Sequence, residues 1–70
     1  MAQTICMPLL QEGTDVWRPV QAEPLGGELF RVLGEVPEEE MWKFPPGTIV
    51  LCREQVFDGG RRDLAAYATA

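Results

Sequence analysis

Residues 42–57 constrain the fold of this chain more than any other stretch. They combine a turn signal, Pro45-Pro46-Gly47, with the longest apolar and β-branched run of the sequence, residues 48–52. From residue 48 to residue 57 the side chains alternate with a period of two, which is typical of a strand with one buried face. We therefore predict a β-strand over residues 48–57, at the centre of a small sheet.

Four other runs of the chain have the features of short strands. They cover residues 3–10, 14–25, 28–33 and 61–69. Turn signals and one polar connection separate the runs, at residues 11–13, 26–27, 34–41 and 58–60. Five short strands with a turn roughly every 8–12 residues predict an all-β fold, and a small five-stranded SH3-like barrel is the economical way to close it. Residues 63–70 would also tolerate a short helix, since they are rich in Leu and Ala.

The alternation also predicts which side chains face the interior of the barrel. These are Val16, Val20, Ala22, Phe30 and Val32. Trp17 then lies on the outer face of its strand, over a neighbouring strand. The prolines at positions 8, 19 and 24 donate no ladder hydrogen bond, so we expect edges or bends there.

The length of the chain predicts one SH3-like barrel domain, residues 1–70, with a small core. A domain of this size buries only about 60% of its unfolded surface, so a disulfide, a metal or self-association often supports it. The chain has two cysteines and no histidine, which excludes a His-based metal site, and two thiolates alone make a poor zinc site. Self-association is the route that remains.

The missing residue types count against an enzyme. The chain has no His, Ser or Asn, so the constellations of the common hydrolases cannot form within one chain. The candidate nucleophiles are the threonines and the two cysteines, and only Cys52 has a basic neighbour, Arg53. We predict no catalytic, cofactor-binding or metal-binding residue, and an enzyme is the less favoured class.

The formal charge of −5 opposes nonspecific binding to nucleic acid or to anionic membranes. Arg61 and Arg62 follow two glycines and could grip a phosphate, but they stand against eleven acidic residues, so we predict no nucleic-acid partner. The first ten residues lack the basic start of a secretion signal, and no segment is as long as a membrane span. We predict a cytoplasmic location and no membrane partner. Cys6 and Cys52 are then expected as buried, reduced thiols, with a disulfide between them as the alternative.

Three segments of the chain look like those of short uncharacterised bacterial proteins of about this length. They are residues 8–20, 30–34 and 42–52, and the resemblance extends over most of the chain. It implies an SH3-like barrel and no particular activity. The chain departs from signalling SH3 domains, because it lacks the Ala-Leu-Tyr-Asp-Tyr element of their proline-peptide groove. In size and barrel class alone it is similar to the plasmid-type dihydrofolate reductase, whose site forms in the pore of a tetramer.

Aromatic and acidic side chains make up the candidate site. We predict a protein-interaction surface formed by Trp17, Trp42 and Phe44, with Glu38, Glu39 and Glu40 at its rim. The alternatives are that the rings lie flat over the barrel wall and that the glutamates form an ordinary solvated loop.

Two functions follow from these observations. The first is a small non-enzymatic barrel that acts through protein–protein contacts, with a second copy of itself among the partners. The second is a small-molecule binding protein or an enzyme whose site forms between subunits, because symmetry multiplies the few polar groups that one chain supplies.

Overall fold

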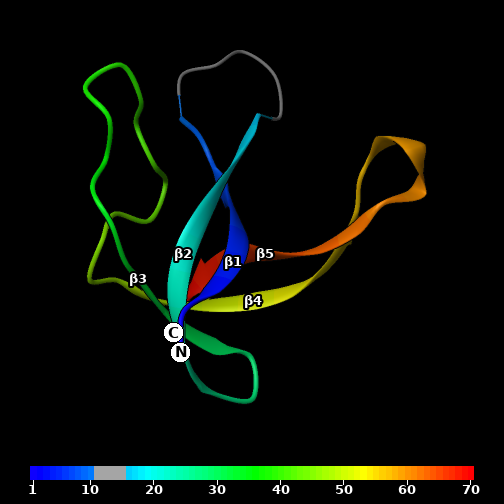
Figure 1. Cartoon of the computed structure of the whole chain (residues 1–70), viewed down its shortest axis with the longest axis horizontal. Coiled ribbons are helices and arrows are strands. Elements are labelled where there is room, and N and C mark those ends of the chain that lie inside the picture. The colour runs from blue at the N-terminus through cyan, green and yellow to red at the C-terminus, as the bar shows by residue number, and fades with distance from the viewer. Residues whose placement is uncertain (11–15) are drawn as a thin grey trace.

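In the computed structural model of this chain, five strands follow one another around a closed barrel (Figure 1). The structure describes residues 1–10 and 16–70. The strands are β1 (Gln3–Pro8), β2 (Trp17–Gly26), β3 (Leu29–Val32), β4 (Ile49–Val56) and β5 (Arg62–Thr69). A single 3₁₀ turn, η1 (Asp58–Gly60), joins β4 to β5, and the described residues contain no α-helix. The all-β class and the five-stranded barrel are confirmed, in a form consistent with an SH3-like barrel.

The barrel closes between its first and last strands. Consecutive strands of the meander are antiparallel, so β1 and β5 run parallel where they meet, with Cys6 opposite Ala65. The C-terminal run is therefore a strand, as first predicted, and not the short helix. Pro19 pairs with β1 only, since β2 meets β3 only from Ala22 onward, and this agrees with the edge expected at that proline.

The register of the strands sends alternate side chains into one apolar core. Of the predicted interior residues, Val20, Ala22, Phe30 and Val32 are buried, whereas Val16 is half-buried. The full core cluster comprises Ile5, Met7, Val20, Ala22, Phe30, Val32, Trp42, Phe44, Val50, Cys52 and Ala66.

The hairpin formed by β4 and β5 extends away from the barrel (Figure 1). The pairing of its two strands shifts between Leu51 and Cys52, which is the mark of a β-bulge. Val56 lies near the far end of this hairpin and is 57% exposed, although it shares a strand face with the buried Val50. The alternation of the sequence thus continues past the point where the core ends.

The β3–β4 connection, residues 33–48, packs against the end of β1 and the residue that follows it. Trp42 forms an isolated bridge with Leu9, and the Lys43 amide donates to the Pro8 carbonyl. This pairing turns Trp42 and Phe44 inward, and they are only 9% and 6% exposed. The prediction that these two rings lie on an exposed surface is therefore wrong, because extra backbone pairing with the end of β1 carries them into the core.

No helix among the described residues has the length and apolar character needed to cross a lipid bilayer.

Candidate functional site

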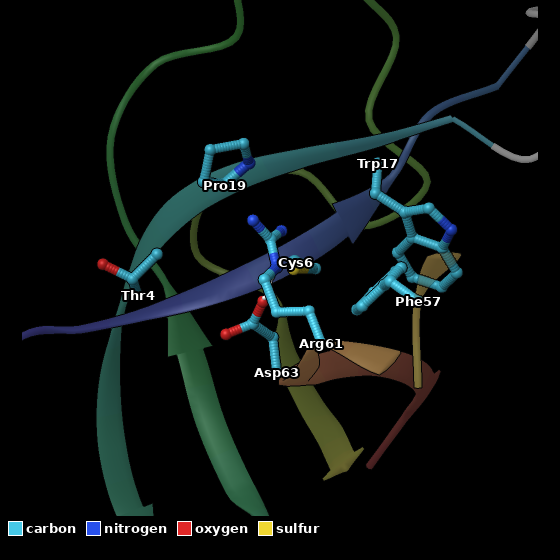
Figure 2. A pocket seen from close by; sticks show the side chains of 7 residues that line it. All are labelled: Thr4, Cys6, Trp17, Pro19, Phe57, Arg61 and Asp63. Atoms are coloured by element: carbon cyan, nitrogen blue, oxygen red, sulfur yellow. Dashed lines mark ion pairs between the residues drawn. The ribbon is translucent and has the colours of Figure 1, made fainter. Parts of the chain in front are cut away.

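Two hollows lie side by side on the outer face of the barrel, and Trp17 lines both of them. The larger has a volume of about 660 Å³ and is lined by Thr4, Cys6, Trp17, Pro19, Phe57, Arg61 and Asp63 (Figure 2). We call it the aromatic groove. The smaller has a volume of about 310 Å³ and is lined by Pro8, Trp17, Lys43, Arg53, Gln55, Ala65, Ala66 and Tyr67. We call it the cationic hollow.

The aromatic groove forms where the start of β2 meets the far end of the β4–β5 hairpin. Trp17 and Pro19 alternate along the outer face of β2, and Phe57 follows the last residue of β4. The rings of Trp17 and Phe57 meet edge to face, with centroids 5.5 Å apart and planes at 82°. This is a favoured geometry for aromatic pairs, because the positive edge of one ring faces the negative face of the other. The contact thus ties the start of β2 to the tip of the β4–β5 hairpin.

Polar groups occupy the middle of the groove, between the aromatic pair and Thr4 (Figure 2). Arg61 and Asp63 form an ion pair of 2.8 Å, and the Arg61 guanidinium lies 6.0 Å from the centre of the Phe57 ring. Both charged side chains are well exposed, so the pair adds little to stability. Its effect is to add one donor group and one acceptor group to the polar hydroxyl of Thr4 in this groove.

The two cysteines differ in position but not in reactivity. Cys6 lines the aromatic groove, whereas Cys52 belongs to the core, and both are buried and free. Burial raises the pKa of the Cys6 thiol, with a further contribution from Asp63. Burial raises the pKa of Cys52 to about 11, and Glu28 adds to this effect. Both thiols are therefore protonated near neutral pH and are poor nucleophiles. The expectation that both thiols are buried is confirmed, and their reduced state stays a prediction.

One side chain that lines the cationic hollow is Arg53, which stacks on the ring of Tyr67. The Arg53 guanidinium lies 4.6 Å from the centre of the Tyr67 ring, and the Tyr67 hydroxyl donates to a Glu28 carboxylate oxygen at 3.3 Å. Partial burial, and then Glu28, raise the pKa of Tyr67, so the phenol stays a neutral donor. Lys43 also lines this hollow and is exposed. Stacking on a ring fixes the plane of a guanidinium and leaves its N–H edge free to bind.

Lys43 and Arg53 also stand apart in their ion pairing. The other four basic side chains each pair with a carboxylate, as Arg18–Glu40, Arg31–Glu23, Arg61–Asp63 and Arg62–Glu54. Neither Lys43 nor Arg53 forms an ion pair with any residue that the structure describes. The two cations that have no acidic partner among the described residues therefore line the same hollow.

The structure separates the six predicted interaction residues. Trp17 lines both hollows, whereas Trp42 and Phe44 lie in the core. Glu38 and Glu39 are exposed on the β3–β4 connection. The side chain of Glu40 is only 6% exposed, and it pairs with Arg18 and accepts a 3.0 Å hydrogen bond from the Trp42 indole N–H. The Trp42 donor, followed by Arg18, lowers the pKa of Glu40.

The six predicted interaction residues do not include Phe57, Arg53 or Pro19, which also line the two hollows. Phe57 and Arg53 share the outward face of the predicted strand 48–57, and Pro19 shares the outward face of Trp17. Asking which large or charged side chains fall on outward positions would have selected all of them. Their convergence on one side of the barrel depends on the strand order, which the alternation does not reveal.

Metal binding finds no support in the described part of the chain, where no three Cys, Asp or Glu side chains lie close enough to hold an ion. No family model, curated protein or solved structure matches this chain. Its two hollows and the residues that line them are therefore the basis for a functional assignment.

Proposed function

We propose that this chain is a small non-enzymatic binding module that acts through protein–protein contacts, and that a segment of a partner protein docks in the aromatic groove. The observation that carries the proposal is the Trp17–Phe57 pair, two large rings held outside the core at the edge of a hollow of about 660 Å³. Partly exposed aromatic anchors in preformed hollows dominate the energetics of many protein interfaces.

The chemistry of the groove favours binding over catalysis. The chain has no His, Ser or Asn, and the thiol that lines the groove has a raised pKa. The groove instead combines apolar walls with the Arg61–Asp63 pair and the Thr4 hydroxyl as polar groups. A partner that fits is an extended segment with at least one large apolar side chain, whose backbone can hydrogen-bond to those polar groups.

A peptide-display selection against the immobilised barrel tests the groove. We expect peptides with a large apolar side chain to be enriched, and Trp17→Ala to weaken their Kd by about tenfold or more. The control is Ile49→Ala, which removes an exposed apolar side chain that does not line either hollow. Peptides that bind Trp17→Ala as tightly as wild type would contradict the assignment of the groove.

Self-association is the second part of the proposal. It is supported by the small core of a 70-residue chain, which gains stability when a second copy covers exposed surface. The alternative, a small-molecule site between subunits, predicts that metabolites or nucleotides raise the melting temperature. If no compound in a thermal-shift screen raises the melting temperature, the result favours the function through protein–protein contacts. A cytoplasmic location stays a prediction, to be tested by cell fractionation.

A further inference from the structure

Apart from Glu28, which accepts a hydrogen bond from Tyr67, the described charged side chains without an ionic partner fall into two separate groups. Most carboxylates of the described residues are engaged: Glu23, Glu40, Glu54 and Asp63 pair with arginines, and Glu28 accepts from Tyr67. The described carboxylate side chains that remain are Glu35, Glu38 and Glu39, and we call them the acidic tip. The cations that remain are Lys43 and Arg53 of the cationic hollow. Each group carries one sign of charge only.

The acidic tip is exposed and held on an anchored segment. All three of its side chains are exposed on the β3–β4 connection. Glu40, directly after the tip, is anchored by Arg18 and Trp42, and its amide donates to the Pro37 carbonyl. In Figure 1 this connection (green) rises on the side of the molecule opposite to the tip of the β4–β5 hairpin (orange). Of the two cations of the hollow, Lys43 belongs to this same connection and Arg53 to β4. The tip is therefore presented outward.

The cationic hollow is preformed to receive carboxylates. Arg53 is held by its stack on Tyr67, which is held in turn by its hydrogen bond to Glu28. The Lys43 amide donates to the Pro8 carbonyl, and the Lys43 ammonium lies 5.6 Å from the centre of the Phe44 ring. Two positioned cations in a hollow of about 310 Å³ match a pair of carboxylates better than a single small apolar group.

We infer that two copies of this chain associate about a two-fold axis, with the acidic tip of each copy bound at the cationic hollow of the other. This inference rests on the self-association in the proposed function and names the surfaces that make it. A two-fold contact uses each surface patch twice, so one molecule must carry both complementary groups, as this one does. Because the net charge of −5 opposes close approach of two copies, the local match of opposite charges sets the orientation of the pair.

A charge-swap experiment tests the pairing by light scattering after gel filtration. In one variant the tip is reversed by Glu35→Lys, Glu38→Lys and Glu39→Lys, and in the other the hollow is reversed by Lys43→Glu and Arg53→Glu. We expect wild type at twice its 7.8 kDa mass and each variant alone at monomer mass. An equimolar mixture of the two variants is expected to recover the double mass, because both contacts of a mixed pair again join opposite charges.

Two controls separate this contact from general charge effects. Arg31→Glu with Arg62→Glu changes the net charge as much as the hollow variant does, but neither residue lines the hollow, so this protein is expected to keep the double mass. Added salt is expected to dissociate wild type, since the contacts are exposed and screened at about 0.5 M. Circular dichroism verifies folding, and the milder Lys43→Gln with Arg53→Gln replaces any charge-reversal variant that unfolds.

Several outcomes would overturn the inference. These are a monomeric wild type at several hundred micromolar, unchanged mass in either swap variant, or no recovery in the mixture. If wild type is monomeric and binds a Glu-rich peptide through Arg53, the hollow binds a different protein and the inference is also overturned. Peptide binding that depends on Trp17 is measured separately, so the docking function stands or falls independently of the pairing.

Discussion

At the scale of single residues, the acidic run before Trp42 divides into side chains with different tasks. Glu38 and Glu39 are exposed, whereas Glu40 is nearly covered and is held by Arg18 and the Trp42 indole. Of three consecutive glutamates, two therefore expose their charge to solvent, and the third fixes the segment through its bonds to Arg18 and Trp42. The difference arises because the segment bends at this point to bring Trp42 into the core.

The anchoring of Glu40 predicts a pH dependence of stability. The Trp42 hydrogen bond and Arg18 hold the pKa of Glu40 below its ordinary value of 4.5, so in that range the unfolded chain binds the proton more readily than the folded one. The stability from Glu40 is therefore complete above about pH 4.5 and is lost as the pH falls through the lower folded pKa. We expect Glu40→Gln to melt below wild type at about pH 7 and to approach wild type at about pH 3.

Thermal unfolding followed by circular dichroism across this pH range checks the prediction. Glu38→Gln is the matched control, since this exposed neighbour has no ionic partner among the described residues, and its melting temperature should stay near that of wild type throughout. A gap between Glu40→Gln and wild type that is the same at every pH would show that charge plays no part in the anchor.

At the scale of elements, the β4–β5 hairpin is longer than the core it covers. Its far end is held to β2 by the Trp17–Phe57 contact and carries exposed residues such as Val56. The bulge between Leu51 and Cys52 increases the local twist of the hairpin and so changes the direction in which it projects. The aromatic groove therefore exists because the β4–β5 hairpin leaves the barrel and its far end meets β2, a strand with which it shares no backbone pairing.

A double-mutant cycle measures how strongly the start of β2 and the far end of this hairpin are joined. We expect Trp17→Leu and Phe57→Leu to be coupled by about 0.5–1.5 kcal/mol in the free energy of unfolding, since an edge-to-face aromatic pair contributes this much beyond its buried area. Urea unfolding of both single variants, the double variant and wild type supplies the values. Additive single effects would mean that the rings touch without holding the hairpin in place.

At the scale of the whole molecule, one tryptophan links the β3–β4 connection to the core. Trp42 belongs to the β3–β4 connection but packs in the core, and its indole N–H donates a hydrogen bond to the Glu40 carboxylate. A chain of this length has a total stability of roughly 3–10 kcal/mol, so the loss of one large core ring is a substantial fraction of it. Stability and the presentation of the acidic tip therefore depend on the same residue.

Truncation of each tryptophan distinguishes core from surface. We expect Trp42→Ala to lower the free energy of unfolding by about 3–5 kcal/mol and to remove cooperative unfolding, and to abolish assembly with it. Trp17→Ala is expected to cost only about 1 kcal/mol, because Trp17 is half-buried on the outer face. Guanidinium unfolding followed by far-ultraviolet circular dichroism compares the two. Equal losses would mean that the two rings are buried to the same extent.

The sequence by itself determined the class of the fold, most of the strand positions and the side chains of Val20, Ala22, Phe30 and Val32 in the core. These follow from alternation and turn residues, which act over a few neighbours along the chain. The tertiary structure alone decided that Trp42 and Phe44 are buried, that Phe57 meets Trp17, and that Lys43 and Arg53 share one hollow. Each of these depends on contacts between segments that are far apart in the chain. Such contacts are set by the order in which the strands pair around the barrel, and the alternation of neighbouring residues carries no information about that order.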